Sequence, residues 1–166
     1  PTQYVQDVLI GSGITVSNVV FTGDPNQLGE FDANATIPFL GMTDGLLMAT
    51  GDVNVAVGPN DTSAATIMVA NNPGGDIDLN TITGFPTYDA AVLEFDFVSM
   101  GDTIVCSFIL ASEEYPEYVN SINDGFGVFL SGPAISGSFN NGAENIALIP
   151  GTTDAISINN INSTAN

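Results

Sequence analysis

Short stretches in which hydrophobic and polar residues alternate recur along this chain. The clearest spans residues 91–100, AVLEFDFVSM, where large hydrophobic residues alternate with Glu94 and Asp96. A period of two is typical of a β-strand with one buried face. Residues 13–23, GITVSNVVFTG, predict a second such strand, with a bulge near Ser17–Asn18 where the alternation changes phase.

A different pattern covers residues 102–111, DTIVCSFILA, which are hydrophobic on both faces. Such a run predicts a central strand between two layers, with Cys106 as a buried and inert thiol. Residues 4–10, YVQDVLI, form either a short helix or an edge strand. Further strands are predicted over residues 125–132, 145–151 and 155–162.

Turn residues separate these stretches at short intervals, since the chain has 18 glycines and 9 prolines. Many short strands with turn signals between them predict an all-β fold, a two-layer, jelly-roll-like β-sandwich with long rim loops and little helix. Residues 58–81 are the best candidate for a long functional loop, with one helical turn around Ala64–Val69. No repeat or linker interrupts the pattern, so we expect residues 1–166 to form a single domain.

The charge of the chain limits its possible interactions and partners. It has 19 acidic residues, no lysine, arginine or histidine, and a formal net charge of −19. Side-chain salt bridges are therefore impossible, and any buried carboxylate must be protonated, hydrogen-bonded or bound to a cation. Nucleic acid and anionic membrane surfaces are excluded as partners because they attract basic residues. We expect no direct membrane insertion, because the hydrophobic runs are too short to span a bilayer.

The missing basic residues also argue against catalysis. Nucleophiles activated by histidine or lysine cannot be built from this chain. A pair of carboxylates could cleave a glycoside, but the chain has no tryptophan or basic residue to hold a sugar. We expect the protein not to be an enzyme.

A cation site is the more direct expectation. Zinc is disfavoured, because one cysteine and no histidine cannot supply its usual ligands. Glu113 and Glu114 follow the hydrophobic run, and Asn123 and Asp124 precede the next strand. A tight return between these strands would bring both acidic ends to one rim. Ca²⁺ prefers such oxygen ligands, so the sequence predicts a calcium site there.

A second acidic stretch, DIDLN, has Asp76, Asp78 and Asn80 at the spacing of the first half of an EF-hand loop. The match fails at Thr81 and Thr87, which replace the EF-hand glycine and glutamate. The stretch is either a calcium loop of another kind or an ordinary polar turn. We treat Asp76, Asp78 and Asp89 as further candidate ligands.

Four segments occur in an order that resembles the choice-of-anchor L family: TYDAAVLEFDF, FILASEEYPEYV, NDGFGVFLSGP and NIALIPGT. The upstream segments SGITVSNVVFTG and GLLMATGDV extend the resemblance to about Val8–Asn162. It implies a β-rich module of a larger bacterial protein, extracellular or displayed on the cell surface. The start at Pro1 suggests an excised part of a longer chain. Relative to the family, the chain lacks basic residues and C-terminal strands, so further chain or a neighbouring copy would complete the sandwich.

Together these observations predict a non-catalytic, extracellular, calcium-stabilised structural or adhesion module of the bacterial cell surface. Its expected partner is another cell-surface or extracellular protein, or a glycan. One alternative is a self-assembling filament or sheath subunit that exchanges strands between copies. Another is a carbohydrate-binding module that uses Tyr115 and Tyr118 beside the acidic rim.

Overall fold

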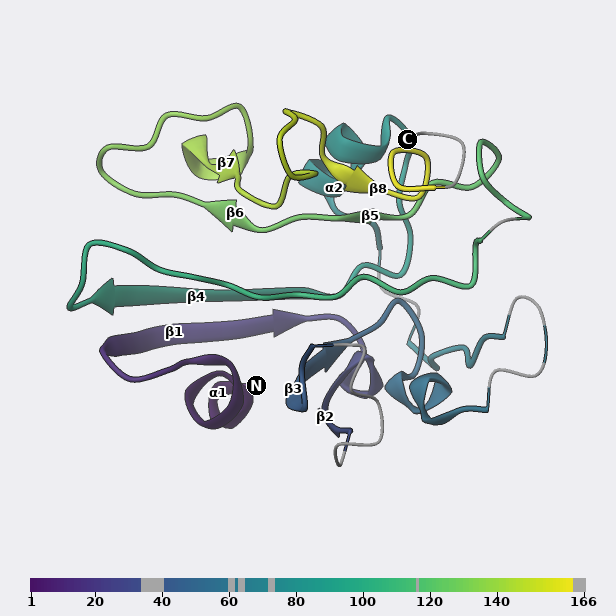
Figure 1. The fold of residues 1–166 in the computed structure, drawn as a ribbon, viewed down its shortest axis with the longest axis horizontal. Coiled ribbons are helices and arrows are strands. Elements are labelled where there is room, and N and C mark those ends of the chain that lie inside the picture. The colour runs from purple at the N-terminus through teal and green to yellow at the C-terminus, as the bar shows by residue number, and fades with distance from the viewer. Residues whose placement is uncertain (34–40, 60–61, 63–64, 72–73, 116, 163–166) are drawn as a thin grey trace. The chain divides into compact units, whose positions relative to one another are not determined.

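The chain divides into two compact units that alternate along the sequence (Figure 1). Unit 1 is Pro1–Pro73 with Asp89–Ile109, and unit 2 is Gly74–Tyr88 with Leu110–Asn166. The prediction of a single domain over residues 1–166 stays a prediction. The computed structural model describes residues 1–33, 41–59, 62, 65–71, 74–115 and 117–162.

The main sheet of unit 1 contains the two strands with the clearest alternation. β1 (Ile14–Thr22) pairs antiparallel with β4 (Val92–Ser99) (Figure 1). The register shifts between Ser17 and Val20, and Asn18 has a left-handed backbone with a φ of 52°. Along β4 the acidic side chains are exposed, and the leucine and phenylalanine side chains between them are half-buried. Both strands and the bulge are therefore confirmed.

A hairpin-like pair in unit 1 has no counterpart in the sequence prediction. β2 (Leu28–Asp32) pairs antiparallel with β3 (Asp44–Met48). Both strands are only five residues long, and each has a glycine that interrupts the alternation of side chains. The pattern was too short and too broken to indicate a strand.

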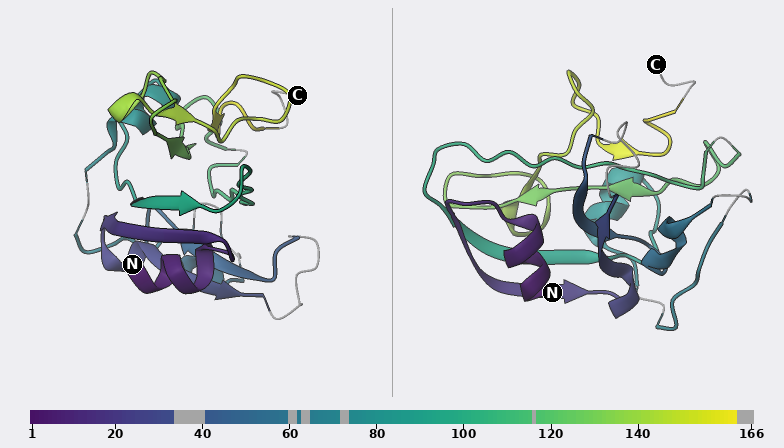
Figure 2. Two further views of the ribbon diagram at one scale, coloured as in Figure 1. Left: turned by 90° about the vertical axis from the view of Figure 1, so that its left-hand side faces the viewer. Right: turned by 60° about the horizontal axis from the view of Figure 1, so that its bottom comes forward.

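Helices cover part of unit 1. α1 (Thr2–Tyr4) continues into a π-helix, η1 (Val5–Leu9), as one coil (Figure 2). This settles the open choice at residues 4–10 in favour of a helix. η1 packs against β1 and β3, and its first residue, Val5, is fully buried. Two 3₁₀-helices follow, η2 (Pro25–Gln27) and η4 (Val53–Val57).

Unit 2 consists of short elements around a small core. β5 (Gly125–Phe126) pairs with β8 (Ile156–Ser157), and β6 (Phe129–Leu130) pairs with β7 (Glu144–Asn145). The helix α2 (Ile77–Thr83) packs against β5 and β8. A 3₁₀-helix, η5 (Asn140–Gly142), precedes β7. Buried hydrophobic side chains in this unit are Ala143, Ala147, Ile156 and Ile158.

The strands predicted over residues 125–132, 145–151 and 155–162 exist, but they are much shorter than expected. Asn145 gives one reason. Its Oδ1 accepts hydrogen bonds from the backbone N–H groups of Val128 and Ala147, both at 3.1 Å. A side chain thus takes donors that a longer strand ladder would have used.

The prediction of a buried central strand over residues 102–111 is wrong. The segment has no strand in the structure, and the backbone of residues 104–107 makes no hydrogen bond to any described residue. Val105 is 83% exposed, and Cys106 is exposed rather than buried. A segment that is hydrophobic on both faces is buried only where other elements pack on both faces. Its own sequence does not show whether such elements are present.

The long loop expected at residues 58–81 is also corrected, because α2 begins inside it. The helical turn expected around Ala64–Val69 is absent over residues 65–69, and Ala64 lies outside the described residues. Gly58 precedes a cis peptide bond to Pro59.

Strands exceed helices among the described residues, and the helices are short, as expected for an all-β fold. The sheets are small and unclosed, so a two-layer, jelly-roll-like sandwich stays a prediction. No helix in the described part of the chain has the length and hydrophobicity needed to cross a membrane.

Candidate functional site

The acidic stretch that follows residues 102–111 forms compact turns in unit 2. The Glu114 backbone N–H donates to Ser112 Oγ at 3.1 Å, and the Glu114 carbonyl accepts from the Tyr118 N–H at 3.0 Å. The Tyr118 carbonyl in turn accepts from the Ile122 N–H at 2.9 Å. These successive bonds turn the chain back toward Asp124.

Asn123 and Asp124 are fixed at the start of β5 by the segment around β8. The Ile158 N–H donates to the Asp124 carbonyl at 3.0 Å, and the Asn159 N–H donates to Asn123 Oδ1 at 3.0 Å. Asn123 Nδ2 donates to the Thr83 carbonyl at 2.9 Å. The Asn123 amide therefore braces α2 against the C-terminal segment, and its oxygen already has a donor.

The structure brings the carboxylates of Glu114 and Asp124 close enough to interact. Burial raises the pKa of Glu114 above its ordinary value of 4.5, and the negative charge of Asp124 raises it further. Burial likewise raises the pKa of Asp124 above 3.8. The Glu114 Oε2 atom is buried and accepts no hydrogen bond within the described part of the chain.

Glu113 and Tyr115 flank Glu114 in the sequence. Glu113 is half-buried in the same turn, and burial raises the pKa of the adjacent Tyr115 hydroxyl. Two partly desolvated carboxylates without a basic residue can do one of two things: share a proton or hold a cation. We refer to Glu113, Glu114 and Asp124 as the acidic turn.

Asp76 and Asp78 have structural partners elsewhere in unit 2. Asp76 is the N-cap of α2, and its Oδ1 accepts from the Asp78 and Leu79 N–H groups, both at 2.9 Å. The Asp78 carboxylate accepts from the Asn140 N–H at 3.0 Å. The D-x-D-x-N spacing thus begins a helix here, and its interpretation as a calcium loop stays a prediction.

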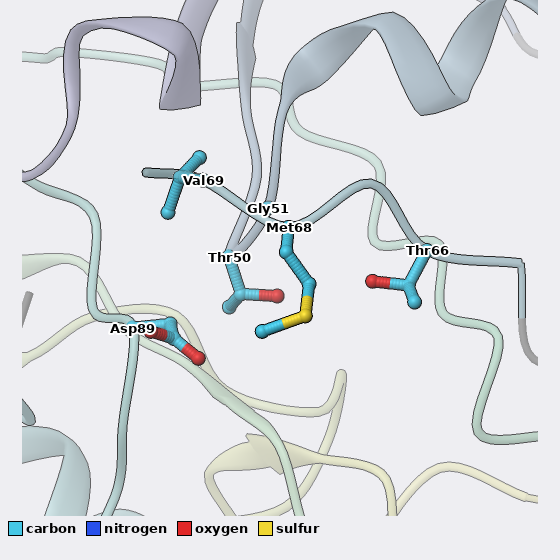
Figure 3. A pocket seen from close by; sticks show the side chains of 6 residues that line it. All are labelled: Thr50, Gly51, Thr66, Met68, Val69 and Asp89. Atoms are coloured by element: carbon cyan, nitrogen blue, oxygen red, sulfur yellow. The ribbon is translucent and has the colours of Figure 1, made fainter. Parts of the chain in front are cut away.

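Asp89 belongs to unit 1 and lines a pocket of about 90 Å³ (Figure 3). Its backbone is left-handed, with a φ of 54°, and its carbonyl accepts from Gln27 Nε2 at 2.8 Å. Its Oδ1 atom is buried without a hydrogen-bond partner in the described structure. The other lining residues are Thr50, Gly51, Thr66, Met68 and Val69.

Sequence reasoning missed the best-satisfied carboxylate of unit 1, that of Asp24, which is 3% exposed. It accepts from the Asn26 N–H at 3.0 Å and from the backbone and Nδ2 of Asn71 at 3.1 and 3.0 Å. The Asn26 N–H holds the pKa of Asp24 below its ordinary value despite desolvation, with help from Asn71. The sequence DPNQ could have revealed it, because Asp24 and Gln27 have the spacing of a capping box and Pro25 is typical of the first position of a helix.

No cluster of three or more Asp, Glu, Cys or His side chains positioned to hold a metal ion occurs among the described residues. The acidic turn therefore could not complete a coordination shell with carboxylates alone. Backbone carbonyls and water would have to supply the remaining ligands.

The whole chain, residues 1–166, matches the choice-of-anchor L domain. The chain belongs to the choice-of-anchor L family. As a member of this family it is a surface-associated domain of a bacterial protein, which confirms the resemblance seen in its sequence. No curated protein and no solved structure matches it.

Proposed function

We propose that this choice-of-anchor L domain is a non-catalytic, extracellular structural or adhesion module that Ca²⁺ stabilises at the acidic turn. The module would belong to a larger bacterial surface protein, with another surface protein or a glycan as its partner. A two-layer β-sandwich would present the turn at its rim.

One observation carries the calcium proposal: the buried Glu114 Oε2 has no hydrogen bond in the described structure and lies near the negative charge of Asp124. Two like charges that burial brings together destabilise the fold unless a proton or a cation neutralises them. The sequence offers no basic side chain for this purpose. A hard divalent cation suits carboxylate oxygens best.

The ligands come from both sides of the turn. Glu114 and Asp124 would hold the ion, with Glu113 as the nearest additional carboxylate in sequence. Ca²⁺ takes six to eight oxygen ligands, so backbone carbonyls and water would fill the rest of the shell. Asn123 would act as a brace that orients Asp124. Because the unfolded chain has no assembled site, binding would contribute directly to the free energy of folding.

Thermal unfolding in EDTA and in excess Ca²⁺ tests the proposal. At a calcium concentration about 100 times the Kd, binding stabilises the fold by roughly 2.7 kcal/mol. For a chain of this length that free energy raises the Tm by roughly 5–10 °C. The double variant Glu114→Gln/Asp124→Asn should fold and lose this shift.

Glu144→Gln/Asp154→Asn is the matched control, because it removes the same charge from exposed positions of unit 2. This control should keep the calcium response. Mg²⁺ at the same ionic strength separates specific binding from screening of the net charge. An unchanged wild-type Tm in Ca²⁺, or an equal shift in both double variants, would refute the acidic turn as a calcium site.

A second candidate, self-assembly by strand exchange between copies, is favoured by the segment at residues 104–107. Ile104 and Val105 are 46% and 83% exposed, and the backbone of this segment makes no hydrogen bond to any described residue. Such a segment can pair with a strand of another copy. Size-exclusion chromatography should show concentration-dependent oligomers, and Val105→Asp should remove them. A monomer at all concentrations would contradict this candidate.

The carbohydrate-binding alternative stays a prediction. Tyr115 is half-buried, and Tyr118 is 37% exposed. A glycan array with the wild type and Tyr118→Ala would test it.

A further inference from the structure

The pocket beside Asp89 in unit 1 lies outside the function proposed above. It has a volume of about 90 Å³, and it is lined by Thr50, Gly51, Thr66, Met68, Val69 and Asp89. In Figure 3, oxygens of Thr50, Thr66 and Asp89 point toward a common space, and the Met68 side chain lies between them. The pocket thus combines a carboxylate and two hydroxyls with apolar surface.

Hydrogen bonds hold the walls of this pocket in place. Gln27 is fully buried, and its Nε2 donates to the carbonyls of Thr50 at 2.9 Å and Asp89 at 2.8 Å. The Asp52 N–H donates to the Ile67 carbonyl at 2.8 Å, which ties the segment with Thr66 and Met68 to the segment with Thr50 and Gly51.

The chains approach so closely at Gly51 that a Cβ there would lie 2.6 Å from the Ile67 carbonyl oxygen. Only glycine allows this approach without a shift of the backbone. The wall of the pocket at Gly51 is therefore closely packed, whereas the Met68 side chain at its mouth is 81% exposed.

Asp89 supplies the charge. Its left-handed backbone, which Asp tolerates better than most residues, sets the direction of its side chain. The buried Oδ1 atom has no hydrogen-bond donor among the described residues. A buried carboxylate oxygen without a donor is costly, and a ligand that brings donors would remove this cost.

The lining favours one class of cation. A single carboxylate is a poor match for Ca²⁺, which prefers six to eight oxygens, and the Met68 and Val69 side chains offer it nothing. A primary ammonium group has three N–H donors, which match the Asp89 carboxylate and the Thr50 and Thr66 hydroxyls. The methylene groups behind the nitrogen would lie against Met68 and Val69.

The size of the pocket and the composition of the chain agree with this ligand. Water occupies about 30 Å³ in the liquid, so the pocket has room for about three water molecules or for an ammonium with its nearest methylenes. The chain has no lysine, so the group must come from another molecule. We propose that the Asp89 pocket binds a primary ammonium on an alkyl stem, from a lysine side chain of another protein or from a free alkylamine.

NMR titration of the full chain tests this proposal, in EDTA and about 150 mM salt, where screening limits general attraction to the acidic surface. The probes are Nα-acetyl-lysine N-methylamide, n-butylamine and the uncharged Nα-acetyl-norleucine N-methylamide. Both amines should shift the backbone signals of Thr50, Gly51, Thr66 and Asp89, and the norleucine compound should not. Binding of the lysine probe alone would identify a peptide-linked lysine as the ligand.

Variants separate the pocket from the net charge. Asp89→Asn keeps a residue that tolerates the left-handed backbone, and it should weaken amine binding at least about tenfold. Thr66→Val should weaken it less. Glu94→Gln removes one exposed charge from unit 1 and should leave binding unchanged. Glu114→Gln/Asp124→Asn should also leave it unchanged, so the two proposals can fail separately.

Three results would overturn the proposal. One is the absence of signal shifts at millimolar amine. Another is equal affinity of the wild type and Asp89→Asn, which would indicate general charge attraction. The third is a Ca²⁺ titration that shifts the same pocket signals and prevents amine binding, which would make this pocket a metal site.

Discussion

Asp24 in unit 1 and the Glu114–Asp124 pair in unit 2 are both desolvated carboxylates, but they differ in the hydrogen-bond donors that surround them. Asp24 is 3% exposed, yet N–H groups of Asn26 and Asn71 donate to both of its oxygens, and its pKa is lowered. Glu114 has a buried oxygen without a donor among the described residues, it faces another negative charge, and its pKa is raised. The structure satisfies the first carboxylate internally and leaves the second for a proton or an ion.

In a chain without basic residues, this difference separates acids that the fold supplies with donors from acids for which the described structure shows no donor. N–H donors from a capping box and an asparagine can stabilise an anion as well as a salt bridge can. An acid with such donors has fewer lone pairs left for a ligand and gains less from binding one. An acid without them stores an unfavourable interaction that binding can relieve.

The largest predicted effect concerns the network around Asp24. Gln27→Leu removes the acceptor of the Asp24 N–H and the donor to the Thr50 and Asp89 carbonyls. Leaving these buried groups without partners should lower the free energy of unfolding by roughly 3 kcal/mol or more. Urea denaturation measures this loss of free energy of unfolding. Gln6→Leu, at an exposed position of η1, is the control, and a loss below about 1 kcal/mol would contradict the role given to Gln27.

A smaller effect should come from the brace beside the acidic turn. Asn123→Ala removes hydrogen bonds to Thr83 and Asn159 and should cost about 1–3 kcal/mol. The Tm shift with Ca²⁺ should persist, because in the proposed site Glu114 and Asp124 hold the ion and Asn123 only orients Asp124. Asn26→Ala, which leaves its backbone N–H in place, should cost less than about 0.5 kcal/mol. If Asn123→Ala abolishes the calcium shift at unchanged fold, Asn123 is a ligand and not only a brace.

The two acidic sites should respond to pH in opposite directions. In EDTA, the raised pKa values of Glu114 and Asp124 mean that these two groups hold more protons in the folded chain than in the unfolded chain. Their contribution to stability should therefore rise as pH falls from neutral toward 4.5. The lowered pKa of Asp24 gives stability that is lost as pH falls below 3.8. Chemical denaturation across this range measures both.

Saturating Ca²⁺ should reverse the first trend, because protonation of the acidic turn would expel the ion. In EDTA, the double variant Glu114→Gln/Asp124→Asn should show a smaller change of stability with pH than the wild type. If the stability of the wild type in EDTA falls steadily from neutral pH to 4.5, the negative charges of Glu114 and Asp124 do not destabilise the folded chain.

The smallest effect should come from a single neutral substitution. In EDTA, Asp124→Asn removes a like charge near Glu114 and should raise the free energy of unfolding by up to about 1 kcal/mol. Asp24→Asn should lower the free energy of unfolding, because the amide NH2 group would face the donor of Asn26 or those of Asn71, which lie on opposite oxygens of Asp24. Equal signs for the two substitutions would contradict the distinction between the two acids. Differential scanning calorimetry at neutral pH provides the measurement.

The sequence predicted those features that depend on local pattern. The alternation in β1 and β4, the bulge at Asn18 and the return that joins Glu114 to Asp124 all follow from residue order. It also indicated the right family. Local pattern is sufficient to predict a feature that lies within one strand or one turn.

Features that depend on contacts between distant residues could not be predicted. The donors to Asp24 include Asn71, which is 47 residues away. The exposure of Val105 depends on which elements cover the segment, and hydrophobicity alone does not report that. The spacing of Asp76 and Asp78 is common to calcium loops and helix caps, and only the bonds to Leu79 and Asn140 show which geometry this chain adopts.

The alternation of the two units along the sequence has a consequence for the synthesis of the protein. The chain passes from one unit to the other at residues 73–74, 88–89 and 109–110. Unit 1 is complete once Ile109 has left the ribosome, whereas Gly74–Tyr88, made earlier, must wait for everything from Leu110 onward. No single cut in the gene separates the two units from each other, because each is built from two segments that alternate along the chain.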